Sequence, residues 1–217
     1  DMTLEKLKFL ASRVKGYGEK GAPEYAFGYA VLSEALKPHA KAPWVSQAYR
    51  FLLDSLAAVP EENDRTIALV GNAFWPGFVE GIPREASVPW VLEIYRRCLE
   101  IVSQIEDESM KSVGLARISW HLGETVSPDW VPEYYNSLVD LAFDMSDNKE
   151  RAEALSGLAK GLGEWGSADW AGQLVGTLLE KARELPEEPQ DSTGDSPRSI
   201  LLQGITQALG ESGGGIW

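Results

Sequence analysis

The chain contains few of the residues from which most catalytic and metal sites are built. Its 217 residues include one cysteine, Cys98, and two histidines, His39 and His121. A single cysteine cannot form an internal disulfide, and two histidines in distant segments give little material for a metal site or a catalytic triad. The phosphate-loop pattern GxxxxGKS/T and the zinc pattern HExxH are also missing. We therefore expect no catalytic residues, no metal site and no cofactor.

Long apolar runs are missing as well. No stretch approaches the roughly 18 consecutive apolar residues that mark a membrane-spanning helix. The N-terminal segment carries charges at Glu5, Lys8 and Arg13, which does not fit the apolar core of a secretory signal. We expect a cytoplasmic protein without a membrane partner.

The chain has fewer basic than acidic residues. The chain has 20 Lys and Arg against 33 Asp and Glu, which gives a formal net charge of -13. Such a field repels the phosphate backbone of nucleic acids and favours a basic partner. The neighbouring Arg96 and Arg97 are more typical of a solvated helix face than of a nucleic-acid site. We therefore predict no nucleic-acid binding and a protein or peptide partner of basic character.

What the chain does contain is an internal repeat. Shifting the segment that starts at Trp90 by 40 positions superimposes nine apolar residues on nine others. The same pattern starts at Trp44 and at Trp170, each time with one polar exception. Apolar residues at i, i+1, i+4, i+5, i+8 and i+9 form a stripe that can be buried between two neighbouring helices. The matched residues are Trp90, Val91, Ile94, Tyr95, Cys98, Leu99, Ile101, Val102 and Ile105, and Trp130, Val131, Tyr134, Tyr135, Leu138, Val139, Leu141, Ala142 and Met145.

A second helix is expected after each of these first helices. In the last three repeats it ends in Leu-Gly-Glu, at 122–124, 162–164 and 209–211. Glycine just past the last apolar residue is a common helix terminator. Two further helical patterns, at 4–14 and 25–36, form an atypical first repeat, as expected at the end of an array.

These patterns predict an all-α fold, specifically an α-α superhelix, or solenoid, of about five antiparallel helix pairs. We expect one helical-repeat domain over residues 1–217. Ser127 and Ser167 are the expected N-caps of two first helices. The repeats are expected at about 1–40, 41–86, 87–126, 127–166 and 167–217.

The second helix of the fourth repeat resembles those of HEAT-type repeats. Residues 147–163 have an acidic start, a basic residue one turn later, and Ala and Leu at helical spacing. The basic position recurs at Arg65, Lys111, Arg151 and Arg198. The resemblance covers the last four repeats and implies a HEAT- or armadillo-like solenoid. In such a solenoid these residues and nearby acidic residues form a polar ladder between repeats. A tetratricopeptide-like array stays open, although its period of about 34 residues fits worse.

Eight tryptophans form two sets. The periodic set opens the first helices and is expected to pack each repeat against the next. Trp75, Trp120 and Trp165 stand instead near the ends of second helices. Second helices typically line the concave face of a solenoid, where aromatic residues act as binding anchors. The other interpretation is that these three fill gaps at the rim. The periodic tryptophans are Trp44, Trp90, Trp130 and Trp170.

We predict that the concave groove binds a peptide or protein segment, which makes the chain a non-enzymatic interaction module or scaffold. Two alternatives stay open. One is an all-helical enzyme with a carboxylate site, and the other is a self-associating module whose exposed apolar ends pair into a homodimer. The residues expected to bind the partner are Asn72, Trp75, Arg117, Trp120, His121 and Lys160.

Overall fold

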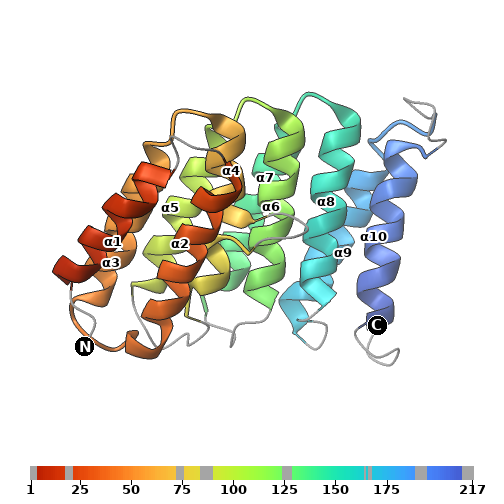
Figure 1. The fold of residues 1–217 in the computed structure, drawn as a ribbon. Coiled ribbons are helices and arrows are strands. Elements are labelled where there is room, and N and C mark those ends of the chain that lie inside the picture. The colour runs from red at the N-terminus through yellow and green to blue at the C-terminus, as the bar shows by residue number, and fades with distance from the viewer. Residues whose placement is uncertain are drawn as a thin grey trace. The chain divides into compact units, whose positions relative to one another are not determined.

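The fold is all-α, as the sequence predicts. In the computed structural model the described residues form ten α-helices and two short 3-10 helices, and they contain no β-strand (Figure 1). No helix among them is long and apolar enough to cross a membrane. The chain divides into two compact units, which we call unit 1 (residues 1–105) and unit 2 (residues 106–217). The described residues are 4–17, 22–71, 76–83, 90–123, 129–163, 165, 168–188 and 195–211.

Unit 1 is built around α2, which lies against its neighbours on several sides. It contacts α1, α3, α4 and the 3-10 helix η3, and α3 in turn contacts α5. Six positions of the predicted apolar stripe are buried in α3 and six in α5, and five of these positions are equivalent in the two helices. The elements of unit 1 are α1 (Leu4–Tyr17), α2 (Ala22–Leu36), η2 (Lys37–His39), α3 (Val45–Ala57), α4 (Glu62–Val70), η3 (Phe78–Gly81) and α5 (Val91–Ser103).

The second helix of the predicted 41–86 repeat is shorter than the repeat pattern suggests. It ends at Gly71, which adopts a φ of 74° and is the only described residue with positive φ. The backbone of Gly77 lies directly against that of Gly71, since a Cβ added at Gly77 would lie 2.2 Å from the backbone nitrogen of Gly71. Glycine is required at this crossing, since any side chain would separate the two backbones.

Unit 2 has two layers of helices (Figure 1). Helices α6, α8 and α10 lie side by side in one layer, and α7 and α9 lie in the other. Helix α8 is central, because it contacts all four of the other helices. The elements are α6 (Glu108–Gly123), α7 (Val131–Phe143), α8 (Asn148–Gly163), α9 (Asp169–Ala182) and α10 (Pro197–Glu211).

Two of the four periodic tryptophans, Trp90 and Trp170, pack against the preceding first helix as predicted. The Trp90 ring lies 5.0 Å from the ring of Tyr49 in unit 1, and the Trp170 ring lies 5.6 Å from that of Tyr135 in unit 2. In both cases the residue that opens one first helix rests on a tyrosine of the preceding first helix. Cys98 is fully buried and burial raises the pKa of its thiol, so it behaves as a core hydrophobe.

Three of the four aligned basic residues, all arginines, bind main-chain carbonyls at the turn inside their own helix pairs. Arg65 donates a hydrogen bond to the carbonyl of Val59, and Arg151 donates to the carbonyl of Met145. Arg198 likewise donates to the carbonyl of Leu185. Each arginine therefore caps the C-terminal end of the preceding first helix, where carbonyls lack helical partners. We call these three residues the arginine clamps.

A carboxylate provides the link between successive pairs in unit 2. Glu108 of α6 accepts hydrogen bonds from the backbone N–H groups of Ser146 at 2.8 Å and Asp147 at 2.6 Å. These bonds, led by the one from Ser146, hold the pKa of Glu108 below its usual value. The arginines bond within their own helix pairs, so this link between two pairs comes from the Glu108 carboxylate at a helix start, which suits the helix dipole, and involves no arginine ladder.

The ends of the second helices match the sequence, while the N-caps do not. Helices α6 and α8 end at Gly123 and Gly163, as the Leu-Gly-Glu pattern predicts. The N-cap positions of α7 and α9 are held by Trp130 and Ala168, without a side-chain cap hydrogen bond. Ser127 and Ser167, the expected caps, lie outside the described residues.

Candidate functional site

Four of the six predicted partner-binding residues lie on two helices of unit 2. Arg117, Trp120 and His121 belong to α6, and Lys160 belongs to α8. Asn72 and Trp75 lie outside the described residues. The candidate site is therefore built here from α6 and α8 alone.

Small residues bring α6 and α8 into close contact. A Cβ added at Gly157 would lie 2.3 Å from the Cβ of Ala116, and one added at Gly161 would lie 2.0 Å from the Oγ of Ser119. Gly204 of α10 meets Ser156 of α8 in the same way, at 2.2 Å. Interiors packed this closely resist deformation, so this layer is a firm platform for the side chains that it carries.

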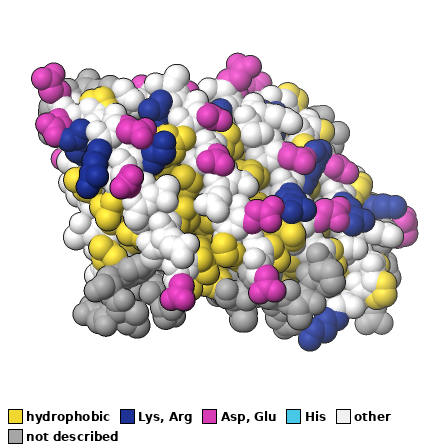
Figure 2. Space-filling view, turned by 180° about the vertical axis from the view of Figure 1, so that it is seen from behind, with side chains coloured by type: hydrophobic (Ala, Val, Ile, Leu, Met, Phe, Trp, Pro, Cys, Tyr) yellow, Lys and Arg dark blue, Asp and Glu magenta, His cyan; other side chains and the backbone are white. Residues whose placement is uncertain are grey.

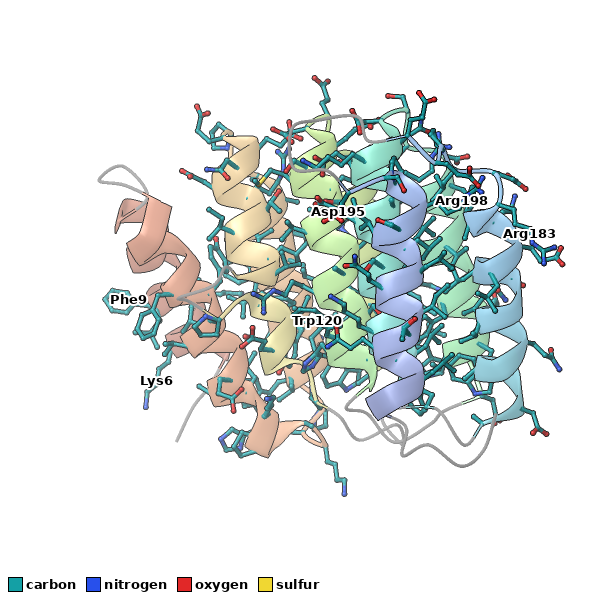
Figure 3. The ribbon with its side chains drawn as sticks, turned by 90° about the vertical axis from the view of Figure 1, so that its right-hand side faces the viewer. Lys6, Phe9, Trp120, Arg183, Asp195 and Arg198 are labelled. Atoms are coloured by element: carbon teal, nitrogen blue, oxygen red, sulfur yellow. The ribbon has the colours of Figure 1, made fainter. Side chains whose placement is uncertain are left out.

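The solvent-facing side of α6 carries a tryptophan that is exposed. Trp120 is 41% exposed, and the guanidinium of Arg117 lies 5.1 Å from the centre of its ring. Val113, two turns earlier on α6, is 38% exposed. Figure 3 shows Trp120 on the side of unit 2 away from α9. We call Val113, Arg117 and Trp120, together with Lys160 of α8, the Trp120 surface.

The remaining candidates near this surface belong to the core. His121 is 5% exposed, so it supports α6 from within and adds nothing to the exposed surface. Trp165 is 7% exposed, and its ring lies 5.7 Å from that of Trp170. Of the three tryptophans near the ends of second helices, Trp120 alone among the described residues has the exposure of a binding anchor. Trp165 fills a gap instead.

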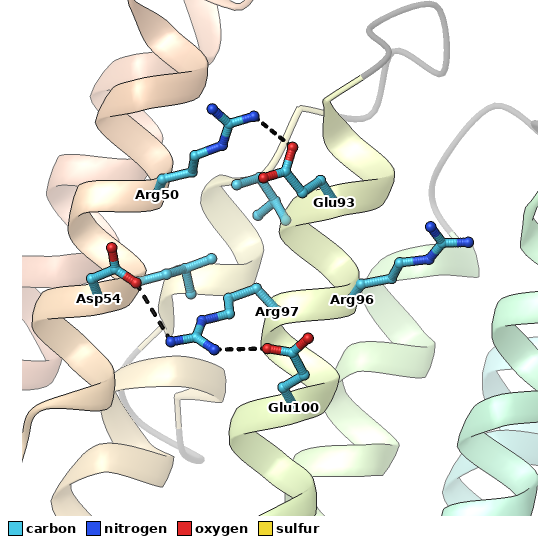
Figure 4. A pocket seen from close by; sticks show the side chains of 8 residues that line it. Arg50, Asp54, Glu93, Arg96, Arg97 and Glu100 are labelled. Atoms are coloured by element: carbon cyan, nitrogen blue, oxygen red, sulfur yellow. Dashed lines mark hydrogen bonds and ion pairs between the residues drawn. The ribbon is translucent and has the colours of Figure 1, made fainter.

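Unit 1 contains a hollow that sequence reasoning did not identify. It has a volume of about 310 Å³ and lies between α3 and α5, with Leu53 and Ile94 among its lining residues (Figure 4). Arg50 bridges to Glu93 at 2.5 Å. Arg97 bridges to Glu100 at 2.7 Å and reaches Asp54 at 3.5 Å.

These charges balance one another across the hollow. The lining includes three arginines and three carboxylates, and Figure 2 shows side chains of both signs next to each other on this face. Exposed ion pairs of this kind are worth little and are typical of a solvated helix face. The spacing of 43 residues between paired partners is the only sequence signal that could have indicated the contact.

Groups that could perform catalysis are sparse in the part of the chain that the structure describes. No cluster of three or more His, Cys, Asp or Glu there could hold a metal ion. Glu150 of α8 lies 3.2 Å from the Oγ of Ser112. Burial, followed by the nearby charge of Glu153, raises its pKa. Glu150 and Glu153 both lie in the first two turns of α8, where the helix dipole favours carboxylates.

Two short glycine patterns were missed in reading the sequence. Residues 16–21 match GxGxxG and residues 210–214 match GxSxG. Both patterns acquire meaning only where a strand leads into a helix. The described residues contain no strand, and both segments lie partly outside them. We attach no function to either.

Comparisons with protein-family models, with curated proteins and with solved structures found no match to this chain.

Proposed function

We propose that the chain is a HEAT-like α-solenoid that acts as a non-enzymatic binding module, with the Trp120 surface as its site for a peptide or protein segment. The observation that carries the proposal is the exposed ring of Trp120 with Arg117 against it. Trp and Arg are the residue types most enriched at the energetic centres of protein interfaces. An indole offers a large contact area with few rotatable bonds, so little entropy is lost when it binds.

The support beneath this tryptophan favours the same proposal. Gly161 sits against Ser119, the residue next to Trp120, so the backbone that carries the indole is fixed by close packing. A partner that binds a fixed surface does not have to order it, and this saving increases affinity. The solenoid is supported by the recurrence of the Trp-on-Tyr contact in both units.

A random-sequence peptide library displayed on phage tests the proposal. Peptides selected on the wild-type protein would be measured by calorimetry against Trp120→Ala. The matched control is Leu179→Ala, which removes an apolar side chain of 40% exposure from α9 in the other layer. Loss of a hot spot of about 2 kcal/mol predicts roughly 30-fold weaker binding for Trp120→Ala and little change for Leu179→Ala. The proposal fails if no selected peptide depends on Trp120.

A second candidate function, self-association, is favoured by a different observation. Four large apolar side chains of α1 and α2 are exposed: Phe9 at 64%, Leu10 at 39%, Phe27 at 44% and Val31 at 47%. Phe27 and Val31 are one turn apart on α2, and Figure 3 shows Phe9 pointing away from unit 1. Light scattering at two concentrations tests it. If the chain forms a homodimer through this face, the measured mass of the wild-type protein should rise with concentration. The Phe9→Glu variant should keep the mass of a monomer at both concentrations.

A further inference from the structure

Arg117 and Lys160 have neither a carboxylate partner nor a bond to a main-chain carbonyl among the described residues. Neither forms an ion pair with an acidic residue among those the structure describes. By contrast, Arg50 is paired with Glu93, and Arg97 with Glu100. Arg65 and Arg151 also lack a carboxylate partner in the part of the chain that the structure describes, but their guanidinium groups are bonded to main-chain carbonyls. The side chains of Arg117 and Lys160 are partly exposed and therefore accessible to an anion from outside.

The two cations come to the level of Trp120 from two different helices. Arg117 rests against the indole from within α6. Lys160 reaches the same level from α8, because Gly161 packs directly against Ser119 and these two residues are the sequence neighbours of Lys160 and Trp120. The close approach of the two helices thus brings Lys160 of α8 to the level at which α6 presents Trp120 and Arg117.

Described carboxylates are confined to the other end of these helices. On α6 the acidic residue is Glu108, at the first position, and its carboxylate is already bonded to the backbone at Ser146 and Asp147. On α8 the acidic residues are Glu150 and Glu153, both in the first two turns. Lys160 is two turns beyond Glu153. On α6 and α8, the described charged residues at the level of Trp120 are therefore Arg117 and Lys160, both positive.

We propose that the partner of the Trp120 surface is an acidic peptide segment, in which an apolar side chain covers Trp120 and neighbouring Asp or Glu side chains bind Arg117 and Lys160. This inference rests on the proposed function of the same surface. It differs from the basic partner that the net charge of -13 suggests. At physiological ionic strength the Debye length is about 8 Å, so charges in direct contact outweigh the field of the distant acidic residues.

A peptide fits this site better than a nucleic acid. Nucleic-acid sites neutralise several successive phosphates, and their affinity rises with the number of cations in contact. Two cations beside one ring suit a short segment with one or two carboxylates. The negative net charge of the protein does not prevent a local contact with one or two carboxylates. It does oppose the approach of a long polyanion such as a nucleic acid.

The test uses the peptides selected in the display experiment, together with a double variant, Arg117→Gln with Lys160→Gln. The matched control is Lys181→Gln with Arg183→Gln, which removes one lysine and one arginine at the C-terminal end of α9 and changes the net charge equally. Arg117→Lys keeps the charge and reports whether the guanidinium's stacking on Trp120 contributes separately. Far-ultraviolet circular dichroism and thermal melting establish that each variant is folded. A thymine-only DNA 20-mer is the nucleic-acid probe.

The inference predicts that peptides dependent on Trp120 are rich in Asp and Glu. Their affinity should fall at least tenfold in the Arg117/Lys160 double variant and less than twofold in the control. Their affinity for the wild-type protein should also fall as the salt concentration is raised. Peptides that need Trp120 but are neutral or basic, or that bind the double variant normally, overturn the acidic partner and leave the binding function standing. Absence of any Trp120-dependent peptide overturns the binding function itself. Tight binding of the DNA probe at Trp120 would replace the peptide by a nucleic acid.

Discussion

Unit 1 and unit 2 use the same close contact although the elements that make it differ. In unit 2, Gly161 lies within the sixteen-residue helix α8 and meets Ser119 of α6. In unit 1, the second helix α4 has only nine residues, and the contact is made by Gly81 of the 3-10 helix η3 against Ser33 of α2. The glycine-on-serine contact therefore occurs in both units, although in unit 1 a 3-10 helix supplies the glycine in place of a long second helix.

A tyrosine hydroxyl accompanies the contact in both units. Tyr49 lies 2.9 Å from the carbonyl oxygen of Ser33 and is also within hydrogen-bonding distance of the carbonyl of Gly81. Tyr135 donates to the carbonyl of Ser119 at 2.9 Å. Burial raises the pKa of Tyr49, so its hydroxyl remains a donor. The comparison suggests that a serine, a glycine and a tyrosine together form the joint between neighbouring helix pairs.

The largest effect is expected from filling the glycine position. Gly161→Ala places a Cβ 2.8 Å from the Ser119 backbone, which cannot move aside, so we expect a loss of about 1–3 kcal/mol in unfolding free energy. Gly81→Ala, with a Cβ 2.5 Å from the Ser33 backbone, should lose a similar amount. Urea denaturation measures both.

Gly176 of α9 provides the control for these substitutions, because a Cβ there meets nothing within 4 Å. Gly176→Ala should be neutral or stabilising by up to about 1 kcal/mol. If Gly161→Ala were as stable as Gly176→Ala, the close approach of α6 and α8 would be wrong. If only one of Gly81→Ala and Gly161→Ala were costly, the two joints would not be equivalent.

A smaller effect is expected from removing the tyrosine hydroxyls. Tyr49→Phe and Tyr135→Phe each remove a buried hydrogen bond, and we expect each to lower the unfolding free energy by roughly 0.5–1.5 kcal/mol. Tyr49→Phe should cost more, since two carbonyl oxygens share its hydroxyl. Thermal melting of the two variants beside the wild type measures this. An unchanged melting temperature in both would show that the hydroxyls are not part of the joint.

The smallest effect concerns Glu108, which has no counterpart in the bonds described for unit 1. Its pKa is lower in the folded protein than the unfolded value of about 4.3, so its contribution is present above that pH and is lost as the pH falls through the folded-state pKa. Because the carboxylate is largely exposed, we expect Glu108→Gln to cost less than about 1 kcal/mol at neutral pH. Urea midpoints measured between pH 7 and pH 3 should converge for wild type and variant at the acidic end. Curves that stay parallel would contradict the assignment.

Much of the fold could be predicted from the sequence, because one strong pattern recurs. The apolar stripes at Trp44, Trp90 and Trp130 predict α3, α5 and α7, and five equivalent positions are buried in all three helices. The Leu-Gly-Glu pattern predicts where α6 and α8 end. These features depend on the local periodicity of hydrophobic residues, which a sequence displays directly.

The parts that could not be predicted depend on contacts between distant residues. Nothing local distinguishes Trp120, which is exposed, from Trp165, which is buried against Trp170. The early end of α4 is decided where Gly71 and Gly77 meet. The glycines in α8 weaken a helix by propensity alone, and only the presence of α6 beside them explains their use.

The arginine clamps carry a consequence for how this protein acquires its structure. Arg65 and Arg151 each bond to a carbonyl only six positions earlier in the chain. Contacts over so short a stretch close small loops and sacrifice little chain entropy, which is why proteins rich in them refold fast, typically in microseconds to milliseconds. A nascent chain leaving the ribosome could therefore complete each hairpin before the next has been synthesised.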